Sequence, residues 1–110
     1  MGNLTLDMKL GDLNPEFRTP IIGDDGVSVV NLTGATARLR ALRPDNTVLD
    51  KALTIEAPAT NGIVSYSWAV GDLPTLGDYY FIVRVTYADG SPQTFPARGV
   101  GIISVNDEFK

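Results

Sequence analysis

Hydrophobic and polar residues alternate with a two-residue period in several segments of this chain. The alternation is clear over residues 4–10, 35–41, 64–70 and 79–87, and a dense β-branched run at 100–105 follows. A two-residue period predicts a β-strand with one buried face. Because no long segment repeats at the helical period, we expect an all-β chain.

Turn residues separate the predicted strands at frequent intervals. Pro44-Asp45-Asn46 predicts a hairpin into a strand at 48–55, and Thr60-Asn61-Gly62 and Asp89-Gly90 predict two more tight turns. Residues 11–34 are interrupted by glycine and proline, so pairing there should be short. This combination of short strands and frequent turns is typical of a β-sandwich or a barrel.

Two aromatic residues are expected to organise the core. Trp68 lies on the apolar side of the 64–70 segment, and we expect it at the core centre. Tyr79 opens the strongest strand just after Gly77. This arrangement is typical of a tyrosine corner, in which the tyrosine hydroxyl binds the backbone a few residues upstream. The corner favours a sandwich.

The composition is that of one globular domain spanning residues 1–110. The hydrophobic share is 44% and the charged share 20%, a balance typical of a packed protein. The net charge of −4 argues against nucleic acid as a partner, because phosphate binding needs clustered basic residues. No stretch is apolar enough to span a membrane, and the N-terminal residues lack the basic region of a signal peptide. We therefore expect neither membrane association nor a cleaved leader.

The range of possible chemistry is limited by residues that the sequence lacks. It contains neither histidine nor cysteine, which removes the commonest general base, the usual zinc ligands and disulfides. Aspartates fall almost entirely in predicted turns, where their side chains cap the backbone. These residues are Asp12, Asp24, Asp25, Asp45, Asp72, Asp78 and Asp89.

Two glycine-containing motifs are interpreted as structural. Asp24-Asp25-Gly26 lacks the alternating ligands and closing glutamate of a calcium loop. Gly99-Val100-Gly101 precedes a strand, whereas a phosphate-binding loop opens a helix, so we expect a bulge or a close-packing site there. The sequence also contains no nucleophile elbow. We therefore expect no catalytic residue, no metal ion and no cofactor.

Exposed apolar residues are the remaining candidates for function, as contacts with a protein partner. The irregular 11–34 segment and the open edges of the predicted sheets are suited to such contacts. The candidate contact residues are Leu13, Phe17, Ile21, Ile22, Val29 and Tyr80. The 4–10 strand could pair with a neighbouring subunit, but we favour pairing within its own sheet.

Several motifs occur in a suggestive order along the chain. They are Asn31-Leu32-Thr33-Gly34-Ala35-Thr36, Arg43-Pro44-Asp45-Asn46-Thr47, Leu76-Gly77-Asp78-Tyr79 and Tyr87-Ala88-Asp89-Gly90 before Phe95-Pro96. From about Leu6 to Val105 the chain resembles the immunoglobulin-like domain at the N-terminus of siphophage baseplate upper proteins and of related stand-alone phage virion proteins. It departs from that pattern at Asn31, where Asp is usual, and at Asn46, where Gly is usual.

The resemblance implies an immunoglobulin-like antiparallel β-sandwich of about seven to eight strands. It implies a structural component of a tailed bacteriophage virion, made in the bacterial host cytoplasm and located in the tail or baseplate, the neck or the capsid surface as a decoration. Its partners would be other phage structural proteins, with a homo-oligomer as a further option, and it implies no catalytic residue. The alternative function is a carbohydrate-binding or host-adhesion module, in which Tyr80 or Phe17 would stack on sugars.

Overall fold

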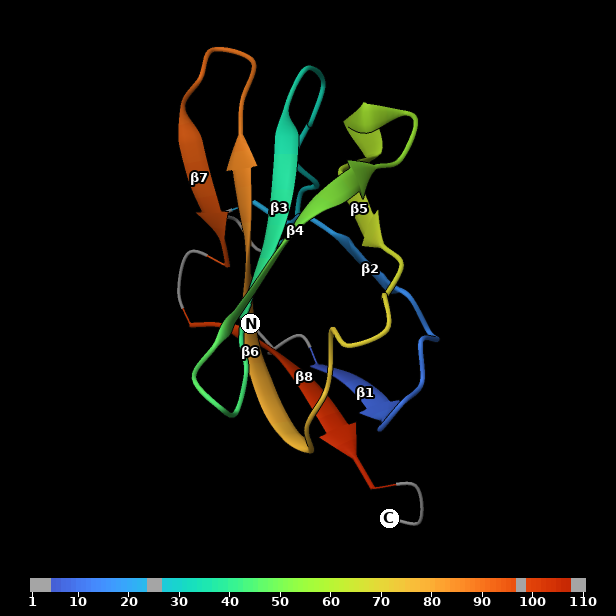
Figure 1. Ribbon diagram of the computed structural model, residues 1–110. Coiled ribbons are helices and arrows are strands. Elements are labelled where there is room, and N and C mark those ends of the chain that lie inside the picture. Colours follow the sequence, from blue (N-terminus) through green and yellow to red (C-terminus); the bar gives the residue numbers. More distant parts are fainter. Residues whose placement is uncertain (1–4, 24–26, 97–98, 108–110) are drawn as a thin grey trace.

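The computed structural model describes residues 5–23, 27–96 and 99–107, and within them it is built from β-strands (Figure 1). The strands are β1 (Thr5–Lys9), β2 (Phe17–Pro20), β3 (Thr36–Leu42), β4 (Val48–Ile55), β5 (Ile63–Tyr66), β6 (Gly77–Thr86), β7 (Pro92–Phe95) and β8 (Gly101–Asn106). In this described part, the one helical element is a short 3-10 turn, η1 (Ala59–Asn61). The all-β prediction is confirmed.

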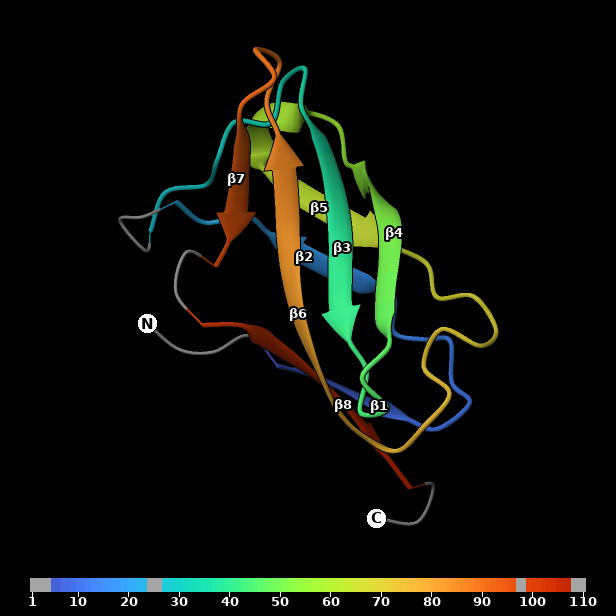
Figure 2. The ribbon, with the colours of Figure 1, turned by 60° about the vertical axis from the view of Figure 1, so that its left-hand side comes forward.

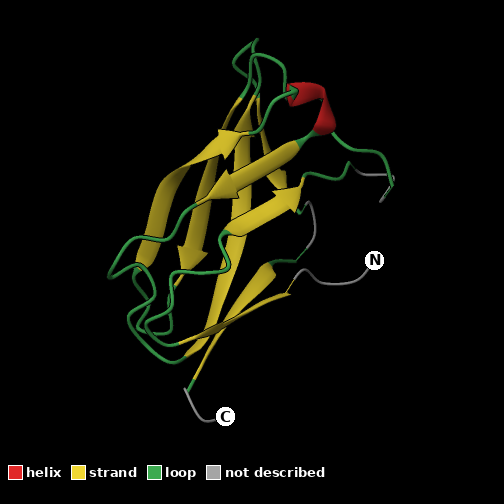
Figure 3. Cartoon of the chain, turned by 90° about the vertical axis from the view of Figure 1, so that its right-hand side faces the viewer, coloured by secondary structure: helices red, strands yellow, loops and turns green. Residues whose placement is uncertain are grey.

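The strands form one mixed, nearly closed sheet with the order β1-β8-β6-β3-β4-β5-β2, and β7 also pairs with β6. The sheet turns back on itself at β4, which pairs with β3 over most of its length and with β5 only at Thr54 and Ile55. As a result β2 and β5 cross behind β6 and β3 in Figure 2 and lie obliquely over the other strands in Figure 3. The architecture is barrel-like and not clearly the expected sandwich.

The expectation of a purely antiparallel sheet is wrong at one pair of strands. β1 and β8 run parallel, with Thr5 opposite Ile102 and Lys9 opposite Asn106. The other paired strands are antiparallel. Because β1 and β8 come from opposite ends of the chain, no tight turn fixes their relative direction. The pairing also confirms that β1 joins the sheet of its own chain.

The core lies between the inner face of the β3–β6 region and the strands β5 and β2. β3 and β6 alternate buried and exposed residues along most of their length, as their sequence period predicts. Leu39, Val64, Tyr79, Val85 and Ile103 are fully buried. At Gly101, an added Cβ atom would overlap the ring of Phe81, so glycine is needed for close packing there. This confirms the close-packing interpretation of the motif at 99–101.

Two apolar residues predicted to face inward are exposed. Leu10 follows the last residue of β1 and is 45% exposed, and Val70 is 89% exposed. β5 ends at Tyr66, so the two-residue period that places Val64 inward no longer applies to Val70. Trp68 is nevertheless buried, since its ring packs edge-on against Phe17 and Tyr66. Its indole N–H donates a hydrogen bond to the Pro15 carbonyl at 3.0 Å.

The predicted tyrosine corner is present. The Tyr79 hydroxyl donates to the Thr75 carbonyl at 2.8 Å and accepts the Thr75 backbone N–H at 2.9 Å. Its ring is completely buried, so both hydrogen bonds form at the edge of the core. The corner thereby fixes the chain where it enters β6.

Candidate interaction surface

The six predicted contact residues do not gather at one place. Phe17 and Ile21 are 2% and 3% exposed, so their assignment as surface contacts is wrong. Phe17 opens β2 opposite Tyr66 and packs edge-on against Phe81, with ring centroids 5.1 Å apart. Ile21 extends the same pairing, since its N–H donates to the Gly62 carbonyl at 2.7 Å. Strand pairing thus draws both side chains into the core.

The remaining four predicted residues are accessible, but they lie in three different parts of the fold. Ile22 and Val29 face each other in an isolated antiparallel bridge, and Val29 is 47% exposed. Leu13 lies in the loop between β1 and β2 and is 40% exposed. Tyr80 lies on the outer face of β6 and is 45% exposed. The motif Asp24-Asp25-Gly26 lies outside the described residues.

Tyr80 belongs to an apolar row that crosses four neighbouring strands. Leu42 on β3 lies opposite both Val48 on β4 and Tyr80 on β6, and Tyr80 lies opposite Ile102 on β8. We call Val48, Leu42, Tyr80 and Ile102 the Tyr80 row. Three of its members are 42–48% exposed, and Ile102 is partly exposed. Ile82, two residues along β6, adds a partly buried apolar side chain to the same face.

Charged residues flank the Tyr80 row on the side toward the C-terminal end of β6. Arg38 and Arg40 both contact Asp50, with N–O distances of 2.8 and 3.6 Å. Arg84 lies directly opposite Arg38 and is exposed. These side chains are between 43% and 52% exposed where they form ion pairs, so the pairs contribute little to folding stability. Their position beside an apolar row is instead typical of the rim of a protein interface.

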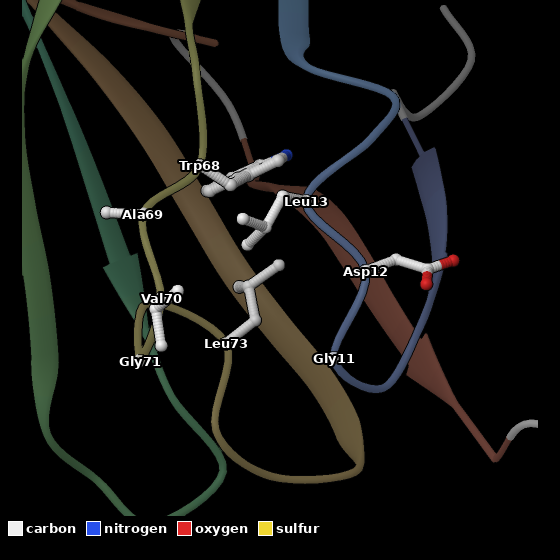
Figure 4. Close-up of a pocket in the computed structure, with 8 residues that line it drawn as sticks. All are labelled: Gly11, Asp12, Leu13, Trp68, Ala69, Val70, Gly71 and Leu73. Atoms are coloured by element: carbon white, nitrogen blue, oxygen red, sulfur yellow. The ribbon is translucent and has the colours of Figure 1, made fainter.

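A small pocket lies at another part of the surface, between the β1–β2 loop and the segment that follows Trp68. Leu13, Trp68 and Leu73 point toward one another there, whereas Asp12 points away (Figure 4). The cavity volume is about 80 Å³. Ligand pockets usually start at roughly 300 Å³, so this one can take an apolar side chain but not a sugar or a nucleotide.

A wider hollow of about 430 Å³ lies beside β1 and is lined mainly by polar residues. Two of its polar side chains, Lys9 and Asn106, already have protein partners. The Asn106 side-chain amide donates to the Met8 and Ser104 carbonyls, and Lys9 donates to the Asp107 carbonyl at 3.2 Å. These two side chains therefore support the pairing of β1 with β8.

Two of the predicted turn aspartates act as turn caps. Oδ1 of Asp45 accepts the backbone N–H and the hydroxyl of Thr47, and Asp89 does the same for Ser91. In each case the hydroxyl hydrogen bond is the main cause that lowers the pKa of the carboxyl group below its usual value. Asn31 binds Thr33 in the same way, so an amide replaces the carboxylate there without loss of the turn. The side-chain oxygens of these three residues therefore stabilise turns of the backbone.

Asp78 lies on β6 and not in the predicted turn, whereas Asp72 differs from the capping aspartates because its carboxylate is buried. Oδ2 of Asp72 accepts the Tyr66 hydroxyl at 2.7 Å and the Ala69 N–H at 2.8 Å. Burial, helped by this carboxylate, raises the pKa of the Tyr66 hydroxyl to about 12. A phenol with so high a pKa stays protonated near neutral pH, so the Tyr66–Asp72 pair holds the segment after β5 in place.

Within the described residues, no group of three or more acidic side chains is placed to hold a metal ion, and no helix is long and apolar enough to cross a membrane. The Tyr80 row is the candidate interaction surface of the described residues. Sequence reasoning identified Tyr80 but missed Leu42, Val48 and Ile102. In the sequence, each of these three is an apolar residue on the otherwise polar side of its strand. That position indicates a shared surface only when the register of the strands is known.

No family model and no curated protein matches this chain.

Proposed function

We propose that this chain is a non-catalytic structural protein of a tailed bacteriophage particle, which acts by binding other proteins of that particle. The observation that carries the proposal is the Tyr80 row, an apolar strip exposed across four strands of a sheet. Contiguous apolar strips with a polar rim are typical of protein interfaces. Proteins of the tail or baseplate, the neck or the capsid surface are the proposed partners.

The immunoglobulin-like class is part of the same proposal. The Tyr79 corner supports it, and so do β5 and β2, which lie across the β6–β3 region (Figure 2) and contribute Phe17 and Val64 to the same core. The phage assignment is supported by the order of the motifs from Asn31 to Pro96. Assembly in the host cytoplasm and residence in the virion follow from that assignment.

A carbohydrate-binding or host-adhesion module is the second candidate, and the exposed ring of Tyr80 is the observation that favours it. Sugar binding by stacking needs an accessible aromatic ring. Among the described residues, Tyr80 is the most exposed aromatic side chain, since Tyr66 and Tyr87 are partly buried and Phe17 and Phe95 are buried. Its neighbours in the row are aliphatic, which suits a protein partner better than a sugar.

Purified particles provide the test. Particles from the bacterial strain that carries the gene are separated by density and analysed by quantitative mass spectrometry. We expect the chain in a fixed ratio to the major capsid and tail proteins, because structural proteins follow the symmetry of the particle. Tyr80→Ser should reduce the incorporated amount, and Glu16→Ser, an exposed change outside the Tyr80 row, should not.

Absence of the chain from purified particles contradicts the proposal. Binding to a glycan array that is lost in Tyr80→Ser favours the second candidate instead.

A further inference from the structure

The charges on the outer face of the sheet differ on the two sides of the Tyr80 row. On one side lie two arginines. Arg40 is opposite Ile82 on the neighbouring strand, and Arg84 follows Ile82 by two residues on β6. On the other side lies the acidic residue Asp78 of β6, followed across the sheet by Ser104 and Asp7. The face therefore changes from basic, through apolar, to acidic along the direction of the strands.

Three of these charges, Asp7, Asp78 and Arg84, have no partner among the described residues. Arg38 and Arg40 contact Asp50, and Lys9 on the acidic side donates to the Asp107 carbonyl. Among the residues that the structure describes, neither Asp78 nor Arg84 forms an ion pair or a side-chain hydrogen bond. Both lie on β6, six residues apart, which is about 20 Å along a strand, so they cannot neutralise each other.

A face of this kind is complementary to itself. A second copy can be rotated by 180° about an axis along the Tyr80 row. Its own Tyr80 row then lies on that of the first copy, and its strands run in the opposite direction to those of the first copy. Asp78 of that copy then lies over Ile82 of the first. There, Arg40 is about 4.8 Å away on the neighbouring strand, and Arg84 is about 6.6 Å further along β6. An arginine side chain spans these distances within the roughly 10 Å between packed sheets.

We propose that the chain forms a two-fold symmetric dimer through the Tyr80 row, with Asp78 of each copy bound to Arg84 and Arg40 of the other. The inference rests on the proposed function in one respect, since it treats the Tyr80 row as a protein-binding surface. It goes further because it assigns a second copy as the partner. Two-fold contacts use the same patch on both subunits, which is what this arrangement of charges allows.

Charge reversal tests the dimer sharply. In Asp78→Lys, or in Arg84→Glu, like charges face each other at both ends of the dimer, so each single variant should associate at least about tenfold more weakly. An equimolar mixture of the two variants should regain wild-type association, because opposite charges meet at both ends of a mixed dimer. Glu16→Lys, which changes the net charge like Asp78→Lys but lies outside the sheet face, should associate normally.

The full chain is studied by sedimentation velocity over about 1 µM to 1 mM, with melting temperatures measured to show that each variant is folded. Tyr80→Ser should also weaken the dimer at least about tenfold, and added salt should weaken the wild-type dimer. A wild-type chain that stays monomeric up to about 1 mM overturns the inference, as does a mixture that fails to regain association. The content of purified particles is measured separately, so a monomeric chain found in particles overturns the dimer and leaves the proposed function in place.

Discussion

The two faces of β6 differ in their surroundings, because one packs in the core and the other is exposed. Its inward residues Tyr79, Phe81, Val83 and Val85 are at most 2% exposed and touch the rest of the core. Its outward side carries Tyr80, which is 45% exposed and lies between Asp78 and Ile82 on that side of the strand. One strand thus supplies the centre of the fold on one side and the candidate interface on the other. Substitutions on the two sides should therefore affect different measurements.

The largest effect on stability is expected from Phe81→Ala. The Phe81 ring packs against Phe17 and covers Gly101, so its removal leaves a cavity at the centre of the sheet. We expect a loss of about 3–5 kcal/mol in the free energy of unfolding, measured by urea denaturation. A loss below about 1 kcal/mol would show that the core can collapse around this site and that the inner face matters less than we argue.

The next effect is expected from Tyr79→Phe, which removes only the hydroxyl of the corner. The Thr75 N–H then loses its acceptor and the Thr75 carbonyl loses its donor. We expect a loss of about 1–3 kcal/mol in the free energy of unfolding, because polar groups at the edge of the core stay unsatisfied. Thr75→Val serves as a control, since it removes the threonine hydroxyl but keeps both backbone hydrogen bonds to Tyr79.

Alkaline pH should lower the free energy of unfolding, because the Tyr66 hydroxyl then loses its proton. Its pKa of about 12 in the folded chain is above the value of about 10 for an unfolded tyrosine, so folding favours the protonated hydroxyl. The stability from this group is complete below pH 10 and is lost as the pH rises from about 10 to about 12. In Tyr66→Phe, the free energy of unfolding should fall less steeply across that window than in wild type. An equal slope in both chains would exclude Tyr66 as the cause.

The smallest effect on stability is expected from Tyr80→Ser. The ring is half exposed and lies outside the core, so the free energy of unfolding should change by no more than about 0.5–1 kcal/mol. Particle incorporation and self-association are the measurements that should change instead. Should Tyr80→Ser unfold the chain, the separation between the two faces of β6 would be disproved.

Local patterns in the sequence were enough to predict most of the strands and turns. The alternation at 35–41 and 79–87 corresponds to β3 and β6, and Asp45 caps the predicted hairpin turn between β3 and β4. The Tyr79 corner was also predictable, because its hydrogen bonds reach only four residues along the chain. Such features depend on residues close in sequence, where period and turn chemistry carry the information.

Features that depend on distant residues could not be predicted in the same way. The parallel pairing of Thr5 with Ile102 joins opposite ends of the chain, and the register that aligns Val48, Leu42 and Tyr80 spans three strands. Phe17 lies in a segment rich in proline and glycine, where no period shows that its side chain faces inward. The inner face was therefore largely predictable, whereas the Tyr80 row required the assembled sheet.

The parallel pairing of β1 and β8 also determines how the chain responds to tension. Opposed forces applied at Thr5 and at Asn106 pull the two strands past each other along their common direction. The hydrogen bonds between them are then sheared together, whereas a hairpin pulled at its ends opens one bond after another. Resistance to such force is governed by the rate of unfolding rather than by the equilibrium stability. We therefore expect the five paired positions of β1 and β8 to resist such a force together.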